Sequence, residues 1–167
     1  FEAAIQKTIK MLQADVETAY LIPRLRPDEC ILLRPPLGFH EATLRARLKV
    51  PPKYSYWLRL LACIYGLKQA SNYWYNELLL ALVSFGWVQC NIDKCLFVKY
   101  DDSTPPVIIA YLVYYVDDIC VCATAEVIEE LKKDLSSRFP MKFLGFPSTF
   151  TGITVRREPG GAVTLRQ

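Results

Sequence analysis

The chain has 167 residues, of which 52% are hydrophobic and 22% are charged, and its formal net charge is +3 at pH 7. This composition excludes a disordered polypeptide and favours one folded domain over residues 1–167. The charge is too small to indicate a nucleic-acid partner by itself. The most apolar window, residues 107–116, is too short to span a bilayer as a helix, so we expect no membrane partner.

The six cysteines predict neither a disulfide framework nor a zinc site. The chain has no Cys-x-x-Cys pair and only one histidine, His40, whereas structural zinc sites combine such pairs with one another or with several histidines. Cys120 and Cys122 lie inside a strand-like run. We therefore expect small buried thiols, as in proteins of a reducing, intracellular compartment.

The first half of the chain predicts short strands. Residues 10–20 are typical of a strand that runs into a turn, residues 30–34 of a short strand that ends at a proline pair, and residues 56–61 of a further extended segment. A basic stretch precedes the last of these. It is interpreted as a solvated loop, with a track for a nucleic-acid backbone as the alternative. Its basic residues are Arg45, Arg47, Lys49 and Lys53.

Two amphipathic helices are predicted, over residues 69–86 and 125–139. Gly86 ends the first and Pro140 ends the second. The residues expected to face inward are Trp74, Leu78, Leu82 and Phe85 in the first helix, and Val127, Leu131 and Leu135 in the second.

The second half also predicts strands at residues 95–100, 107–115 and 119–124. The middle one is apolar throughout, so we expect it in the centre of a sheet. The tail, residues 149–167, alternates around a Pro-Gly-Gly step and predicts a hairpin. Helices on one face of an antiparallel sheet, with crossover connections, make the predicted fold class α+β of the split βαβ kind.

Two adjacent acids, Asp117 and Asp118, interrupt this apolar region between two predicted strands. One interpretation is a solvated turn, because aspartate suits turns. The other is a divalent-cation site, since a hard cation such as Mg²⁺ binds carboxylates and cancels their mutual repulsion. A third carboxylate is then needed. Asp15, at the end of the first predicted strand, is the favoured candidate, with Glu17 as a rival.

The segments around these acids resemble a known family. Residues 115–118, Tyr-Val-Asp-Asp, resemble the YxDD box of reverse transcriptases, and residues 15–20 resemble their first catalytic motif. Residues 64–70, IYGLKQA, resemble the YGLKQA box of Ty1/copia retrotransposon polymerases. Weaker matches occur in the same order along the chain, at residues 34–39, 57–58, 74, 93–97 and 150–153. The chain is thus similar to a Ty1/copia reverse transcriptase over nearly its whole length.

This resemblance implies the palm and part of the fingers of an RNA-directed DNA polymerase, in a ferredoxin-like arrangement with a primer-grip-like hairpin at the C-terminal end. It implies nucleotidyl transfer by two Mg²⁺ ions, for which Mn²⁺ is an expected substitute. Asp15 and Asp117 would bind metal, Asp118 would complete the acidic cluster, and the carbonyl of Val16 would add a ligand.

The resemblance also implies roles in substrate binding. Tyr20 would stack beneath the sugar of the incoming dNTP and exclude a 2′-hydroxyl, although a core aromatic is the alternative. Gln69 would face the nucleotide, or else is a polar residue at a helix start. Lys68 would face phosphate or solvent. Tyr115 and Gly152 would contact the template or primer.

The implied partners are a primed RNA or DNA template, dNTPs, and flanking polyprotein domains such as integrase and ribonuclease H. We expect the N-terminal fingers strands and the thumb to lie outside this chain. The expected location is a cytoplasmic virus-like particle or the nucleus. A catalytically incomplete or domesticated remnant that only binds nucleic acid is the alternative function, and a different two-metal enzyme on a similar palm is a third.

Overall fold

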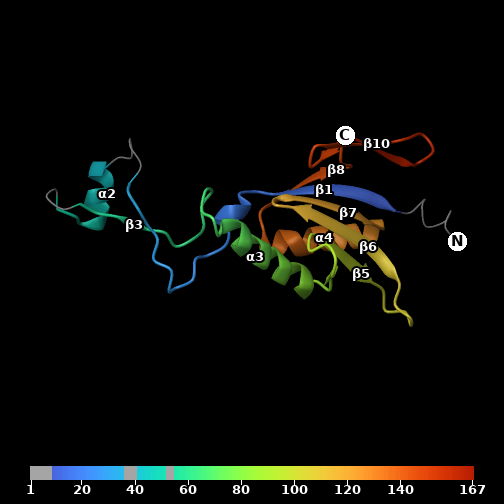
Figure 1. Cartoon of the computed structure of the whole chain (residues 1–167), viewed down its shortest axis with the longest axis horizontal. Helices are drawn as coiled ribbons and strands as arrows, with labels where there is room; N and C mark the ends of the chain where they lie inside the picture. The colour runs from blue at the N-terminus through green and yellow to red at the C-terminus, as the bar shows by residue number, and fades with distance from the viewer. Residues whose placement is uncertain (1–8, 36–40, 52–54) are drawn as a thin grey trace.

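The computed structural model describes residues 9–35, 41–51 and 55–167. Within this part of the chain, the main sheet has six strands in the order β4-β5-β6-β7-β1-β8, and all its neighbouring strands are antiparallel. Two helices, α3 and α4, lie against one face of it (Figure 1). The strands are β1 (Lys10–Val16), β4 (Val88–Gln89), β5 (Leu96–Tyr100), β6 (Ile108–Tyr115), β7 (Asp118–Ala123) and β8 (Met141–Gly145), and the helices are α3 (Ala70–Ser84) and α4 (Ala125–Arg138).

Alternation along the strands divides the sheet into a face that packs on α3 and α4 and an opposite face. On β1, Ala14 and Val16 are buried in the core, and their neighbour Asp15 projects to the other side. On β6, Leu112 is buried whereas Tyr111 is half exposed. The main core therefore fills one side of the sheet, and Asp15 lies on the other side.

Both predicted helices are confirmed, and so are the residues expected to face the core. Trp74, Leu78 and Leu82 of α3 are buried together with Val127, Leu131 and Leu135 of α4 in one cluster, against which Phe85 packs. The helix α3 ends at Ser84, just before the predicted stop residue Gly86, whose φ of 81° is left-handed. There the N–H of Gly86 donates to Val83 and that of Trp87 donates to Leu82, so the last carbonyls are satisfied.

Several elements of the structure were not predicted, among them the short strand β4, the 3-10 helix η1 (Ala19–Leu21), the strand β8 and the helix α2. The strand β8 follows Pro140 and pairs with β1 at the edge of the sheet. It went unrecognised because most of its residues are exposed, so its sequence carries no alternating pattern. The helix α2 (Glu41–Leu48) replaces the loop expected for the basic stretch.

The helix α2 has a local cause. Its residues are mostly good helix formers, and Arg45 forms an ion pair with Glu41 one turn earlier, with 2.8 Å between Nη2 and Oε1. None of its residues is buried, so it lacks the apolar face that periodicity detects. Arg47 lies in the same helix and Lys49 follows it, whereas Lys53 lies outside the described residues.

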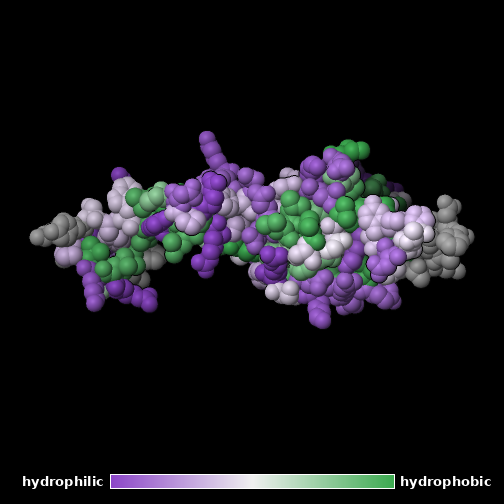
Figure 2. All heavy atoms as spheres, turned by 90° about the horizontal axis from the view of Figure 1, so that it is seen from below, coloured by the Kyte–Doolittle hydropathy of each residue, from purple (hydrophilic) through white to green (hydrophobic). Residues whose placement is uncertain are grey.

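The helix α2 belongs to a narrow arm, which also contains the short strands β2 and β3 and extends away from the body of the molecule, that is, the main sheet and its helices (Figures 1 and 2). Its two legs pair through short strands, β2 (Leu32–Leu33) and β3 (Leu58–Arg59), which are briefer than the segments predicted there. Figure 2 shows hydrophobic patches on both the arm and the body, set among hydrophilic side chains.

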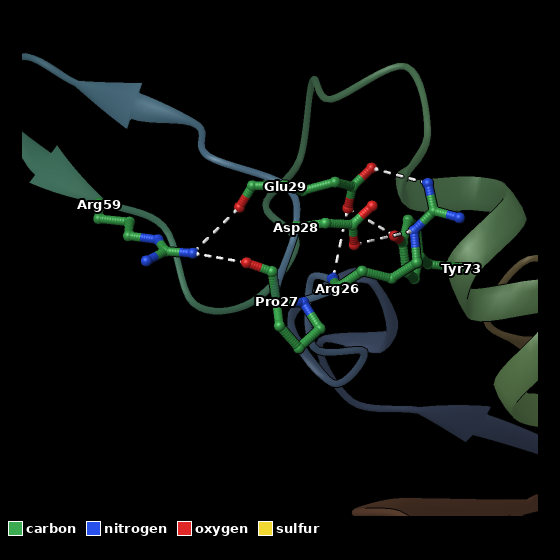
Figure 3. Close-up of polar contacts among 6 residues, drawn as sticks. All are labelled: Arg26, Pro27, Asp28, Glu29, Arg59 and Tyr73. Atoms are coloured by element: carbon green, nitrogen blue, oxygen red, sulfur yellow. Dashed lines mark hydrogen bonds and ion pairs between the residues drawn. The ribbon is translucent and has the colours of Figure 1, made fainter.

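A polar cluster fastens the arm to the body (Figure 3). The guanidinium of Arg59 donates to the carbonyls of Pro27 and Glu29, which joins the two legs. The hydroxyl of Tyr73, on α3, donates to the carboxylate of Glu29, and Arg26 forms an ion pair with the same carboxylate. The arm is therefore attached at the first turn of α3.

The tail forms the predicted hairpin as part of a separate three-stranded sheet. The strands β10 (Ile153–Arg157) and β11 (Val163–Arg166) pair antiparallel, and β9 (Thr149–Phe150) adds to β10. In Figure 1 this sheet lies beside β8 and β1.

The described residues include all six cysteines, and all are free thiols. Cys63 and Cys120 are buried as expected, but Cys30 is exposed. Burial raises the pKa of Cys120 to about 11, so this thiol is unreactive near neutral pH. In the described ranges, no helix has both the length and the apolar character needed to cross a bilayer.

Replacing Leu78 by Ala should lower the free energy of unfolding by about 2–5 kcal/mol, because Leu78 is fully buried in the core and the cavity cannot collapse completely. Leu80→Ala is the matched control. Leu80 lies on the same helix but is 62% exposed, so its loss should cost less than about 1 kcal/mol. Urea denaturation of the two variants measures the difference, and equal losses would contradict the assigned helix face.

Candidate active site

Strand pairing brings the separated acids together. On the face of the sheet opposite the helices, Asp15 of β1 is the register partner of Asp118 of β7. Side chains directly opposite each other on antiparallel strands lie on the same face, with Cβ atoms about 5 Å apart. Asp117 lies in the two-residue turn between β6 and β7, next to Asp118. The sheet thus brings Asp15 close to Asp117 and Asp118, which follow it by 102 and 103 positions in the sequence.

Hydrogen bonds from two other elements hold the acidic turn. The backbone N–H of Val16 donates to the carbonyl of Asp117, with 2.9 Å between N and O. The indole Nε1–H of Trp74, on α3, donates to the carbonyl of Val116. The turn is therefore connected both to β1 and to the helix beneath the sheet.

The three carboxylates repel one another in the absence of a cation. The pKa of Asp15 is raised, first by burial and then by the negative charges of Asp117 and Asp118. Lys142, the register partner of Asp15 on β8, opposes this shift. Its ammonium is also paired with Glu17 at 2.7 Å, which raises the pKa of Lys142. Because these carboxylates repel one another, a bound cation would stabilise their ionised forms.

Gln13 is a site residue that the sequence interpretation missed. It precedes Asp15 by two positions, so its side chain lies on the same face of β1. Its Nε2 donates to Oδ1 of Asp118 at 3.3 Å, although Gln13 is only 8% exposed. The signal was available in the sequence: a polar residue stands between Leu12 and Ala14 in a buried strand, on the same side as the aspartate.

The donor chemistry of this site fits a hard divalent cation. Carboxylate oxygens are the ligands that Mg²⁺ prefers, and the crowding of charge at Asp15 is what a cation relieves. The side chains are not already closed into a cage, since the described residues include no group of three or more aspartates, glutamates, histidines or cysteines arranged to hold a metal ion. Asp15, Asp117 and Asp118 are the residues that could converge on one.

Tyr20 lies close to the acids along the chain, in the 3-10 helix η1 (Ala19–Leu21). It is half buried and packs against both the main core and a smaller cluster around Cys63. Its ring meets that of Tyr65 edge to face, with 5.2 Å between the centroids. Tyr65 belongs to the IYGLKQA segment, so the two segments expected to bind the nucleotide are in contact.

The remaining predicted residues lie on three different elements. Gln69 is the residue before α3, and its side chain makes no capping hydrogen bond. Lys68 beside it is exposed. Tyr115 ends β6 opposite Asp118 and is 62% exposed on the same face as the acids. Gly152, with a φ of 82°, forms the turn between β9 and β10 in the separate sheet. Strand pairing therefore joins only Tyr115 to the acidic group.

Comparison with known proteins gives consistent matches. The family model described as reverse transcriptase (RNA-dependent DNA polymerase) matches residues 2–167. The chain is 35% identical to the Retrovirus-related Pol polyprotein from transposon RE2 of Arabidopsis thaliana over 159 residues, which cover 95% of this chain and 10% of that protein. It is 28% identical to the putative transposon Ty5-1 protein YCL074W of Saccharomyces cerevisiae over 152 residues, which cover 90% of this chain and 44% of that protein.

The chain spans about a tenth of the length of the plant polyproteins that it matches. The family match covers almost all of its residues, and it includes the three aspartates, the IYGLKQA segment and the tail. The chain therefore belongs to the reverse transcriptase (RNA-dependent DNA polymerase) family, and within it to the Ty1/copia type.

Proposed function

We propose that this chain is the palm, with part of the fingers, of an enzyme that adds dNTPs to a primer on an RNA or DNA template by two-metal nucleotidyl transfer. The observation that carries the proposal is the cross-strand pairing of Asp15 with Asp118 beside Asp117. Membership of the reverse transcriptase family supports it.

The order of the elements supports assignment to a polymerase palm. Along the chain, β1, α3, β6, β7, α4 and β8 follow a βαββαβ pattern, and in the sheet the four strands stand in the order β6-β7-β1-β8. We infer a split βαβ arrangement from this order, with β1 between the β6-β7 hairpin and the last strand. It puts Asp15 on the strand between β7 and the edge strand β8, beside the acidic turn.

Asp15 and Asp117, with Asp118 and the carbonyl of Val16, would hold two Mg²⁺ ions. When bound, these ions would lower the pKa of the primer 3′-hydroxyl and stabilise the departing pyrophosphate. The residues of the chain position the carboxylates that would bind these ions. The turn presents Asp117, β1 presents Asp15, and Gln13 orients the carboxylate of Asp118.

We also propose substrate-binding roles for the residues that the family resemblance indicates. Tyr20 would lie beneath the sugar of the dNTP, with Tyr65 supporting its ring. Gln69, which has no capping bond, has its side-chain amide available for the nucleotide. Lys68 would contact phosphate, and Tyr115 and Gly152 would contact the template or primer. The exposed ring of Tyr115 suits stacking against a base or sugar.

The remaining partners are proposed from the family. The Arabidopsis relatives are Pol polyproteins about ten times longer than the matched region, so flanking domains such as integrase and ribonuclease H are expected in the same polyprotein. A virus-like particle in the cytoplasm, or the nucleus, is the proposed site of action.

Primer extension tests the proposed function. The protein, in the longest natural form that contains these residues, is incubated with a DNA primer annealed to an RNA template, dNTPs and Mg²⁺ or Mn²⁺. Extension that disappears on chelation supports the proposal. A folded protein that binds the primed template but extends nothing would instead identify a remnant that only binds nucleic acid.

Replacing Gln13 by Met should reduce primer extension by about 10- to 100-fold, because Asp118 loses the donor that orients it. Methionine keeps the length and volume of the side chain. Gln89→Met is the control, since Gln89 bonds Tyr75 and Lys94 at a distant edge of the sheet. Steady-state rates at saturating dNTP measure the effect, and equal rates for the two variants would remove Gln13 from the site.

A further inference from the structure

The turn that carries Asp117 has an unfavourable backbone conformation. Val116, its first central residue, has a φ of 58°, which is left-handed. Asp117 is not among the positive-φ residues of the described chain. A positive φ at the first central residue and a negative φ at the second match a type II′ turn, whose first central position favours glycine. A β-branched residue is a rare exception there, and such conformations persist only when the surroundings enforce them.

Both backbone carbonyls of this turn accept hydrogen bonds from neighbouring elements. The carbonyl of Asp117 accepts from the N–H of Val16 at 2.9 Å. The carbonyl of Val116 accepts from Nε1 of Trp74 at 2.5 Å, across 42 positions of sequence. The first bond comes from a neighbouring strand, as in many sheets, but the second comes from a side chain in the core beneath the sheet.

Trp74 itself is held firmly. It is 1% exposed, lies in the main core cluster, and meets the ring of Phe139 edge to face at 5.2 Å between centroids. Because packing fixes the indole, its N–H fixes the position of the Val116 carbonyl. That carbonyl and the carboxylate of Asp117 belong to adjacent residues, so the core of the domain determines where the carboxylate lies.

We propose that Trp74 is a positioning residue of the active site, and that its indole N–H holds Val116 in the left-handed conformation that presents Asp117 to the metal and the primer terminus. This inference rests on the proposed function. It differs from a packing role, which any large aromatic side chain at this position would fill.

The chain contains a matched control in Trp87. This indole is 2% exposed and belongs to the same core cluster, but its Nε1 has no hydrogen-bond partner in the described part of the chain. Trp74→Phe and Trp87→Phe therefore remove similar volume from one core. Only the first removes a bond to the acidic turn.

The first experiment compares the two variants in the longest natural form of the protein. Mn²⁺ binding is measured by electron paramagnetic resonance, and kcat and KM for dNTP by primer extension. We expect Trp74→Phe to weaken Mn²⁺ binding and to lower kcat by about 10- to 100-fold, with KM for dNTP little changed. Trp87→Phe should leave all three near the wild-type values. Equal effects of the two variants would overturn the proposal.

The second experiment tests for rescue. Glycine adopts a positive φ without strain, so Val116→Gly should make the turn less dependent on Trp74. Adding Val116→Gly to Trp74→Phe should recover at least part of the lost Mn²⁺ affinity and kcat, which is non-additive behaviour in a double-mutant cycle. If the fold-changes in Mn²⁺ affinity and kcat caused by the two single substitutions simply multiply in the double variant, Trp74 does not act through the turn.

A third measurement does not depend on whether Trp74→Phe folds, because it uses the wild-type protein and Val116→Gly. In the NMR spectrum of the wild-type protein, the indole proton of Trp74 should exchange slowly with water, and Val116→Gly should shift it while leaving that of Trp87 unmoved. Exchange as fast as that of the half-exposed Trp57 would overturn the proposal. Wild-type protein that binds Mn²⁺ but extends no primer would refute the proposed function alone, since the metal-binding comparison still tests Trp74.

Discussion

Asp117→Asn should lower primer extension by about 10³-fold, without a loss of thermal stability in metal-free buffer. The first expectation follows from removing a charged ligand and leaving the transition-state charge uncompensated. The second follows from the structure, because the negative charge of Asp117 raises the pKa of Asp15 and therefore opposes the ionised form of that neighbour. Neutralising Asp117 relieves this repulsion.

Two measurements separate this result from unfolding. Primer extension gives the activity, and thermal melting with and without Mg²⁺ gives the stability; the variant should melt no lower than wild type without metal and gain less from added metal. Asp102→Asn is the control, since Asp102 is exposed in the loop after β5. An Asp117→Asn variant with wild-type activity would end the assignment of this turn as the catalytic centre.

Tyr20→Val should reduce the discrimination between dNTP and rNTP by about 10- to 200-fold in the ratio of kcat/KM values. The proposed reason is steric, because the Tyr20 ring, supported edge to face by Tyr65, fills the space that a 2′-hydroxyl would need. Valine opens that space. Activity with dNTPs should fall less than the discrimination does.

Tyr20→Phe is the matched control, since it keeps the ring and removes only the hydroxyl. It should keep the discrimination near the wild-type value. If Tyr20→Val instead melts at a much lower temperature and shows unchanged discrimination, Tyr20 is a core aromatic, and the alternative interpretation of this residue holds. Single-nucleotide incorporation with each substrate provides the kcat/KM values.

The elements that could be predicted are those with a strong local pattern. Helices α3 and α4 repeat an apolar face at helical spacing, and β6 is apolar along its length, so both helices and the central place of this strand were predicted correctly. The strand β8 and helix α2 bury few or no residues, so the hydrophobic pattern that prediction relies on is absent from them.

The same division applies to the site. Asp15, Asp117 and Asp118 stand out in the sequence because each is an acid beside an apolar strand, and the resemblance to a family linked them. Lys142 escaped notice because its strand did. Gln13 and Trp74 were visible as residues, but their bonds to Asp118 and to Val116 span 105 and 42 positions, and no local rule connects residues so far apart.

The sequence by itself determined the chemical content of this protein: which residues carry charge, which segments with a strong apolar pattern form helices and strands, and which family the chain resembles. The tertiary structure decided which of those residues meet. The physical reason is that residue type and spacing set propensity and amphipathicity, which are local properties. Strand register and core packing are set by the whole chain at once. Only these put Asp15 opposite Asp118, Lys142 beside Asp15, and the indole of Trp74 beneath the acidic turn.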